Sequence, residues 1–193
     1  MKRTIALLIF DDVEVLDFAG PFEVFSVADE RHEYKLFDIT VVAKERKPVT
    51  TRNGLSVNPH RSIEDVTTTD MLIVPGGLGT RPLIHDEGLI DWIKAVSENA
   101  EHVMSVCSGA LLLARAGLLH GLKATTHQGA LKLLSELAPD TEVIPDIRFT
   151  DNGKVLTSAG ISAGIDMSLY MVEKLHGTAV ADATASYMEY RRG

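Results

Sequence analysis

The chain has 193 residues and a formal net charge of −8, with 19 basic and 27 acidic side chains interspersed along it. This length suits one α/β domain over residues 1–193 and can bury a core without covalent staples. A nucleic-acid-binding face is not expected, because only Arg191 and Arg192 approach a basic cluster.

Targeting signals and cysteine content indicate the compartment. After Lys2 and Arg3, the apolar run 5–10 is too short for a signal peptide, and no later run is long enough to cross a bilayer. The single cysteine, Cys107, rules out an internal disulfide and fits a reducing compartment. We therefore expect a soluble cytoplasmic protein with no membrane partner.

The hydrophobic pattern alternates between strands and helices. Short, mostly apolar runs typical of buried parallel strands cover 4–10, 38–44, 70–76 and 102–107. Helical patterns cover 20–30, 89–99, 109–119, 129–137 and 163–191, the last as one or two helices. We expect the first helix to begin with Gly20 as cap and Pro21 as its first residue. Gly117 and Gly121 should end the helix that follows the cysteine.

Two β-hairpins interrupt this alternation. They are predicted at 49–57, turning at Asn53–Gly54, and at 147–158, turning at Asp151–Gly153. The whole pattern predicts an α/β fold, with a parallel sheet between two layers of helices and inserted β-hairpins.

Cys107 lies between a predicted strand and a predicted helix. Ser105 and Gly109 give it small neighbours on both sides, as a nucleophile elbow requires. A sulfur at the start of a helix gains from unpaired amides and the helix dipole, so we expect its pKa to be lowered. The alternative is a small buried hydrophobic residue, the usual role of a free cysteine.

The glycine-rich stretch 74–82 follows another predicted strand. It lacks the spacing of dinucleotide-binding and phosphate-loop motifs. We expect the amides of Gly77 and Ser108 to form an oxyanion hole beside the thiol, unless the glycines serve packing alone.

Asp17 is the acidic residue of interest in the first loop, because Leu16 and Phe18 flank it. Partial desolvation would raise its pKa toward that of a general acid. The acidic residues Asp11, Asp12 and Glu14 are interpreted as solvated loop charges. Loops after neighbouring parallel strands share one crevice, so Asp17, Gly77 and Cys107 should converge.

His127 is the histidine best placed to orient the thiolate, although loop histidines more often are solvated or cap a helix. The seven histidines show no metal-ligand pairing, so the sequence predicts no metal and no cofactor.

Five segments together resemble the ThiJ/PfpI superfamily, whose members are related to class I glutamine amidotransferases. They are LDFAGPFEVF, IVPGG, VCSGALLLARAGLL, ATTH and TSAGISAGID. The resemblance implies a flavodoxin-like sandwich, usually dimeric, with a reactive elbow cysteine at Cys107. It also implies oxyanion-hole amides at Gly77 and Ser108, and a nearby histidine at His127.

Details of the motifs distinguish branches of this superfamily. Ser108 stands where protease-like members carry histidine, so proteolysis is disfavoured. An aspartate in LDFAGP resembles the isonitrile hydratase branch and the ligand domains of AraC-type activators, whereas other branches use a glutamate. Those activators continue into a helix-turn-helix domain, and this chain ends at Gly193. Ser108 departs from the threonine usual in the hydratase, which preserves the hydroxyl.

The sequence leaves three functions open. The first is hydration of an isonitrile to an N-substituted formamide, with Cys107 as nucleophile and Asp17 as acid. The second is a cysteine redox sensor or binding protein without turnover. The third is a glyoxalase-like or amidase-like hydrolase that uses the same thiolate. Each has a small molecule as its partner, and the protein is expected to be a homodimer.

Overall fold

The computed structural model describes residues 2–192 and is built on a seven-stranded sheet of order β10-β11-β7-β6-β1-β2-β5. Its strands are β1 (Arg3–Leu8), β2 (Phe37–Ala43), β5 (Arg61–Ser62), β6 (Met71–Val74), β7 (His102–Ser105), β10 (Phe149–Asp151) and β11 (Val155–Ser158). All neighbouring strands are parallel except β10 and β11. Two smaller sheets pair β3 (Val49–Thr50) with β4 (Ser56–Val57), and β8 (Lys123–Ala124) with β9 (Glu142–Val143).

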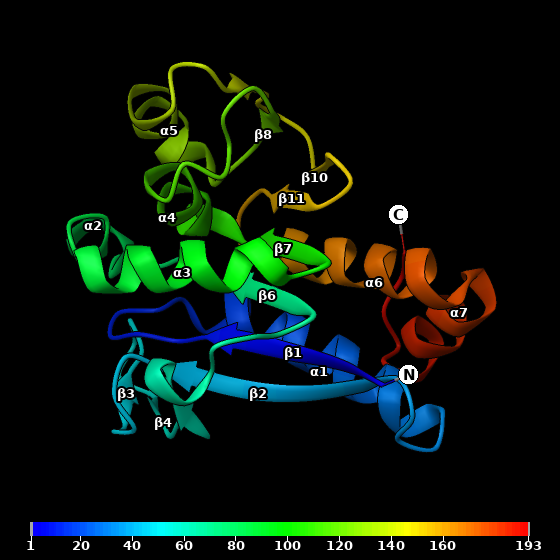
Figure 1. Cartoon of the computed structure of the whole chain (residues 1–193). Helices are drawn as coiled ribbons and strands as arrows, with labels where there is room; N and C mark the ends of the chain where they lie inside the picture. Colours follow the sequence, from blue (N-terminus) through cyan, green and yellow to red (C-terminus); the bar gives the residue numbers. More distant parts are fainter. Residues whose placement is uncertain (1, 193) are drawn as a thin grey trace.

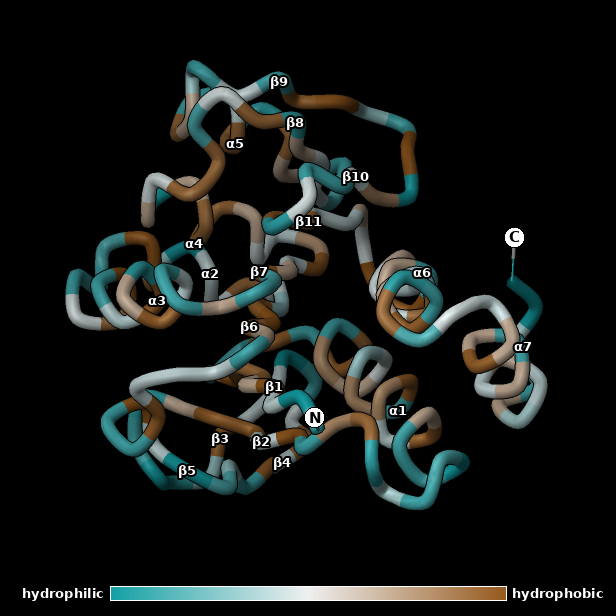
Figure 2. The backbone as a smooth tube through the Cα atoms, turned by 45° about the vertical axis from the view of Figure 1, so that its right-hand side comes forward, coloured by the Kyte–Doolittle hydropathy of each residue, from teal (hydrophilic) through white to brown (hydrophobic). Residues whose placement is uncertain are grey.

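Helices cover both faces of the sheet (Figure 1). The α-helices are α1 (Val15–Arg31), α2 (Thr80–Leu83), α3 (Glu87–Asn99), α4 (Ala110–Arg115), α5 (Leu131–Leu137), α6 (Ala163–His176) and α7 (Thr178–Tyr187). Three short 3-10 turns are η1 (Ile63–Asp65), η2 (Cys107–Gly109) and η3 (Gln128–Ala130). Figure 2 shows α1, α6 and α7 on one side of the strands, and α2, α3 and α4 on the other. The predicted α/β sandwich is thus confirmed.

The core follows the apolar strands predicted from the sequence. All four residues of β6 are buried, and so are all four of β11 and the last four of β1. The tube in Figure 2 is accordingly brown along much of β6 and β1 and teal in most outer loops. Strands buried on both faces need apolar side chains at consecutive positions, which explains why these runs do not alternate.

The register of the parallel strands aligns their carboxyl ends. Val74, at the end of β6, pairs with Ser105 of β7, and Ser105 pairs with Thr157 of β11. The residues that leave these strands, 75–77, 106–108 and 159–161, therefore emerge at one edge of the sheet. Parallel sheets place ligand sites at this edge.

The first helix differs from its prediction. α1 begins at Val15 with Glu14 as cap, so Pro21 lies inside the helix rather than at its first position. Asp17 therefore belongs to the first helical turn and not to a loop. Proline has no N–H, so Pro21 cannot bond the carbonyl four residues earlier, which is that of Asp17. Flanking apolar contacts compensate, since Pro21 and Gly20 are both buried.

The helix after Cys107 is also shorter than predicted. The segment begins as the turn η2 and continues as α4 only to Arg115. Gly117 follows with a φ of 75°, a left-handed conformation that ends the helix where the sequence placed its stop. Both predicted hairpins are present, although their strands are short. No helix in residues 2–192 is long and apolar enough to span a membrane.

Candidate active site around Cys107

Cys107 is the first residue of the tight turn η2, which follows β7. Its φ is 56°, a left-handed value that costs a residue with a side chain about 1 kcal/mol or more. Two contacts hold the turn: the Cys107 N–H donates to the Ala159 carbonyl at 3.1 Å, and Thr126 Oγ1 donates to the Cys107 carbonyl at 2.6 Å. A Cβ at Gly109 would lie 2.1 Å from the Val74 carbonyl oxygen, so only glycine fits there.

The carboxyl of Asp17 is fully buried beneath this turn. Its Oδ2 accepts the Gly76 N–H at 3.1 Å, while Oδ1 is buried with no hydrogen bond to any of residues 2–192. The thiol of Cys107 interacts with the same carboxyl, although the contact does not reach hydrogen-bond geometry. A side chain at Gly76 would clash with both Asp17 and the Ser108 amide. The backbone thus admits the carboxyl directly under the sulfur.

The two groups shift one another's titration. Burial raises the pKa of Asp17 to about 7, against smaller opposing effects from Cys107 and the Gly76 amide. Burial and the Asp17 charge raise the pKa of Cys107 to about 12. Strongly interacting groups titrate as a pair, so between these values the site holds one proton for two potential anions. The expected rise at Asp17 agrees with this geometry.

The lowered thiol pKa expected from the sequence is wrong in direction. The expectation relied on a helix dipole, but α4 has only six residues and begins after the turn η2. The amides of Ser108 and Ile161 do favour the thiolate, yet burial and the neighbouring carboxyl outweigh them. Desolvation therefore decides the resting state of this thiol.

Gly77 and Ser108, the predicted oxyanion-hole residues, lie together, but they are hydrogen-bonded to one another. The Gly77 N–H donates to Ser108 Oγ at 3.0 Å, so in this state a protein hydroxyl occupies that donor. Ser108 Oγ in turn donates to the Gly77 carbonyl at 3.1 Å and lies 3.2 Å from Thr80 Oγ1. The Ser108 amide lies beside the sulfur, where it favours the thiolate. Only this second amide is placed as the sequence predicted.

His127 lies at the wall of the site. Its Nδ1 accepts the Gly129 N–H at 3.1 Å, and its ring packs against the backbone of Gly160. Within residues 2–192 no hydrogen bond joins the ring to Cys107, so the predicted proximity is seen but the predicted orientation of the thiol is not.

A cavity of about 230 Å³ opens above the sulfur. Beyond the predicted residues Gly77, Cys107, Ser108 and His127, its lining includes six that sequence reasoning assigned to no site: Glu14, Arg52, Leu78, Arg81, Gly129 and Ile161. Glu14 is the clearest correction, because it was interpreted as a solvated loop charge. It instead caps α1, faces the cavity and forms an ion pair with Arg52 at 3.2 Å.

Ile161 was missed although its segment was singled out. Its φ is 53°, and its backbone amide interacts with both the Cys107 sulfur and the Asp17 carboxyl. The available signal was the glycine-rich sequence TSAGISAGID directly after β11, which marks a turn at the same sheet edge.

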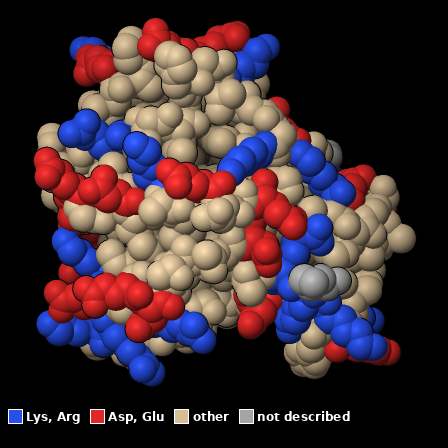
Figure 3. Space-filling model, viewed as in Figure 1, with Lys and Arg blue, Asp and Glu red and all other residues tan. Residues whose placement is uncertain are grey.

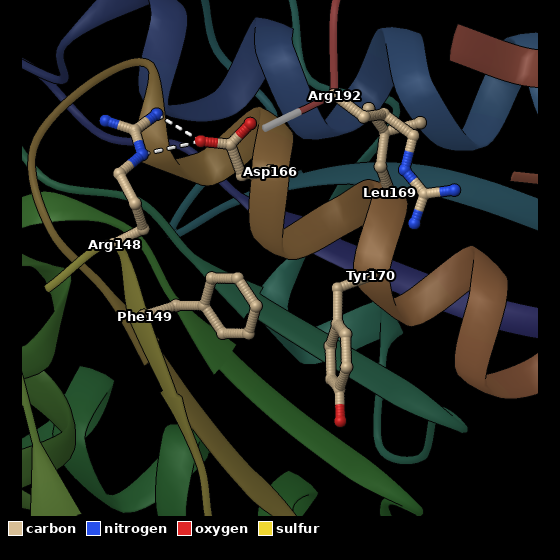
Figure 4. A pocket seen from close by; sticks show the side chains of 6 residues that line it. All are labelled: Arg148, Phe149, Asp166, Leu169, Tyr170 and Arg192. Atoms are coloured by element: carbon tan, nitrogen blue, oxygen red, sulfur yellow. Dashed lines mark hydrogen bonds and ion pairs between the residues drawn. The ribbon is translucent and has the colours of Figure 1, made fainter. Parts of the chain in front are cut away.

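A second cavity of about 230 Å³ lies elsewhere, between β10, α6 and the C-terminal tail (Figure 4). Its floor holds the rings of Phe149 and Tyr170, with centroids 5.0 Å apart. Arg148 donates to Asp166 at 2.6 Å, and Arg192 forms ion pairs with Glu173 and Asp182. Its lining shares no residue with that of the Cys107 cavity.

Charged side chains give no further indication of a site. On the face shown in Figure 3, acidic and basic residues are interspersed. Among residues 2–192, no group of three or more histidine, cysteine, aspartate or glutamate side chains is arranged to hold a metal ion.

Similar proteins share this architecture. A solved ThiJ/PfpI family protein from Pseudomonas syringae superposes with a TM-score of 0.88 at 30% identity, covering 100% of this chain and 77% of that one. The structure of Drosophila melanogaster DJ-1beta superposes with a TM-score of 0.86 at 18% identity, covering 99% of this chain and all of that one.

Relatives in sequence include an enzyme and a transcriptional regulator. Isonitrile hydratase from Pseudomonas putida is 36% identical over 191 residues, which are 98% of this chain and 79% of the relative. The HTH-type transcriptional regulator CdhR from Pseudomonas aeruginosa is 29% identical, over 94% of this chain but only 53% of the regulator. The DJ-1/PfpI family model matches residues 3–174. The chain belongs to the DJ-1/PfpI family.

Proposed function

We propose that this protein is a cysteine-dependent hydro-lyase that converts a small isonitrile into an N-substituted formamide. The observation that carries the proposal is the buried carboxyl of Asp17 beside the thiol of Cys107, an arrangement that raises the pKa of both groups. The 36% identity to an isonitrile hydratase supports the same choice.

Asp17 and Cys107 suit a reaction in which a nucleophile first attacks and an acid then delivers a proton. A carboxyl with a pKa of about 7 is present in both protonation states near neutral pH, which is the best condition for proton transfer in either direction. A thiol with a raised pKa attacks only when its proton has a receiver. Asp17 is that receiver, and Oδ1 is free of other hydrogen bonds to residues 2–192.

The chemistry proceeds in two additions. Asp17 takes the proton of Cys107 as sulfur bonds to the terminal carbon of R–NC, and then delivers that proton to the same carbon. The product is a thioimidate, R–N=CH–S–Cys107. Water then adds to this carbon, with its proton passing through Asp17 to the nitrogen. Collapse breaks the C–S bond, passes the hydroxyl proton to the sulfur through Asp17, releases R–NH–CHO and restores the thiol.

The remaining site residues stabilise the thiolate and contact the substrate. The amides of Ser108 and Ile161 stabilise negative charge on sulfur when it forms and leaves. His127 and Gly77 form walls of the cavity, and His127 meets the substrate rather than the thiol.

The environment of the thiol favours turnover over redox sensing. Sensor cysteines are exposed and have lowered pKa values, which makes them easy to oxidise. Cys107 is only 6% exposed, and its pKa is raised. This difference disfavours the sensor hypothesis.

The test is formamide production from a panel of isonitriles, with dicarbonyls and amides as competing substrate classes. Wild type should hydrate an isonitrile, and Cys107→Ala should lose at least about 1,000-fold in turnover. The matched control is Ser105→Ala, another small buried side chain near the turn. Hydrolysis of dicarbonyls or amides alone would replace the hydratase with the third function. No turnover of any class would leave a binding protein.

Other expectations from the sequence stay predictions. They are the cytoplasmic location, the single domain and the homodimer. Light scattering of the 21.0 kDa chain at micromolar concentration tests the last, and a monomer mass would contradict it.

A further inference from the structure

Arg81 lies at the cavity wall with one edge of its guanidinium uncommitted. It lies on α2, and its Nη1 donates to the Gly77 carbonyl at 3.2 Å and to Thr80 Oγ1 at 2.9 Å. Both partners are neutral. Neither Nε nor Nη2 has a hydrogen-bond partner among residues 2–192, and no carboxylate there lies within ion-pair distance. These two nitrogens form the edge that binds a carboxylate in two parallel hydrogen bonds.

The other charges that line the cavity cancel. Glu14 and Arg52 form an ion pair with one another, whereas Arg81 has no carboxylate partner among the lining residues. The two hydrogen bonds hold the guanidinium against the Gly77 loop, so an incoming anion meets a positioned donor rather than a flexible one.

The rest of the lining limits the size and polarity of the ligand. Leu78 and Ile161 are large apolar side chains that remain 52% and 38% exposed at this cavity. They suit a short hydrocarbon segment. A volume of about 230 Å³ is below the range of cavities that hold drug-sized ligands, so the ligand has few heavy atoms.

We propose that Arg81 selects substrates that carry a carboxylate, so that the preferred substrates are small isocyano carboxylic acids. The isocyano carbon lies at Cys107, the hydrocarbon segment contacts Leu78 and Ile161, and the carboxylate binds Arg81. This inference rests on the proposed function for the isocyano group, while the carboxylate site rests on the cavity alone.

Alkylation of the single cysteine tests the carboxylate site without any turnover. Iodoacetate and iodoacetamide each form an Sγ–CH₂ bond and release iodide, and they differ in one carrying a carboxylate. The same thiolate attacks the iodide-bearing carbon of both reagents, so the ratio of their rates cancels any change in thiol pKa. Intact mass reports the modification unambiguously, because Cys107 is the only cysteine.

The ratio of iodoacetate to iodoacetamide rates should fall about tenfold in Arg81→Gln, the loss expected for one charged hydrogen-bonded contact. Arg115→Gln is the matched control. Arg115 also donates to a backbone carbonyl, that of Ile84, but does not line the cavity, and its loss changes net charge equally. Arg115→Gln should keep the wild-type ratio.

Two results would refute the carboxylate site. One is an unchanged ratio in Arg81→Gln. The other is an equal fall in Arg115→Gln, which would indicate a long-range charge effect. Melting temperatures of both variants confirm that the compared proteins are folded.

The rate of isonitrile hydration provides a second test of the carboxylate preference. Wild type should hydrate isocyanoacetate with a kcat/KM at least about tenfold above that of its methyl ester, and Arg81→Gln should remove this preference. If neither these two compounds nor the rest of the isonitrile panel were hydrated, the hydratase would be refuted but the alkylation result would stand. Equal hydration of both would refute the carboxylate preference and leave the hydratase standing.

Discussion

The Cys107 cavity and the cavity at Arg148 enclose equal volumes of about 230 Å³ and differ in how their polar groups are satisfied. At Arg148, the carboxylate of Asp166 accepts hydrogen bonds on both oxygens, from Arg148 and from Tyr190. At Cys107, the carboxyl of Asp17 is fully buried, has one unsatisfied oxygen and lies under a residue with positive φ.

Because the two cavities have equal volumes, the state of their polar groups distinguishes a functional site from a packing gap better than volume does. Satisfied charges stabilise the tail over α6 and leave nothing for a ligand to complete. An unsatisfied carboxyl and a strained turn cost stability, and they persist because the surrounding strands determine them. Strongly shifted pKa values are typical of functional sites, and the Cys107 cavity is the one of the two that holds such a pair.

The largest expected effect compares Asp17 with Asp166 directly. Asp17→Asn should lower turnover about 100-fold to 10,000-fold, because the amide keeps the shape but cannot exchange a proton. Asp166→Asn should change turnover less than about threefold and lower the melting temperature, because it weakens the contacts of Arg148 and Tyr190. The measurement is kcat per folded molecule beside thermal unfolding. Full activity in folded Asp17→Asn would remove it from the mechanism.

The dependence of stability on pH should reveal the same contrast. The unfolded Asp17 carboxyl ionises near pH 4, whereas the folded one holds its proton to about pH 7. The folded state therefore binds the extra proton, and stability falls as pH rises from 4 to 7. Relative to Asp17→Asn, wild type should lose up to about 4 kcal/mol across this range. Urea unfolding of both proteins at pH 4 and pH 8 measures the difference, and a constant difference would contradict it.

Titration of the thiol provides a smaller effect. The rate of iodoacetamide alkylation against pH should have its main midpoint above that of a free thiol, near 8.5, because burial and Asp17 oppose the thiolate. Asp17→Asn removes the charge and should move the midpoint down by about one unit. A wild-type midpoint below 8.5 would restore the helix-dipole interpretation.

Two buried serines give the smallest expected effect. Ser108→Ala removes the hydroxyl that pairs with Gly77 and lies beside Thr80, and should cost about 1 to 2 kcal/mol of unfolding free energy. Ser105 Oγ is buried without a partner among residues 2–192, so Ser105→Ala should be neutral within about 0.5 kcal/mol. Denaturant unfolding measures both, and equal losses would show that the hydrogen bonds at Ser108 add nothing.

The fold was largely predictable because its strongest signals are local. Long apolar runs such as 4–10 and turn residues such as Asn53–Gly54 act over a few positions, and both were interpreted correctly. The start of α1 was not, because Pro21 follows a helix-start rule that tertiary packing overrides.

Sequence order indicated that Cys107, Asp17 and Gly77 lie together, but it indicated neither the rest of the cavity lining nor the electrostatics of the site. Cys107, Asp17 and Gly77 follow strands whose ends meet, which sequence order alone indicates. The pKa of the thiol depends on how completely it is desolvated, and burial is a property of the assembled core. Arg81 was invisible for the same reason, since only the structure shows which arginines lack acidic partners.

The contacts that hold the turn of Cys107 come from far along the chain. The carbonyl of Ala159 and the amide of Ile161 reach it only after β11 has joined the sheet. During synthesis, the ribosome must add roughly 50 more residues before these partners exist, which takes about 3 to 10 s at ordinary elongation rates. For that interval the nascent chain carries an ordinary exposed thiol, open to any oxidant or alkylating agent. Damage to this cysteine should therefore be concentrated in newly made chains rather than in old ones.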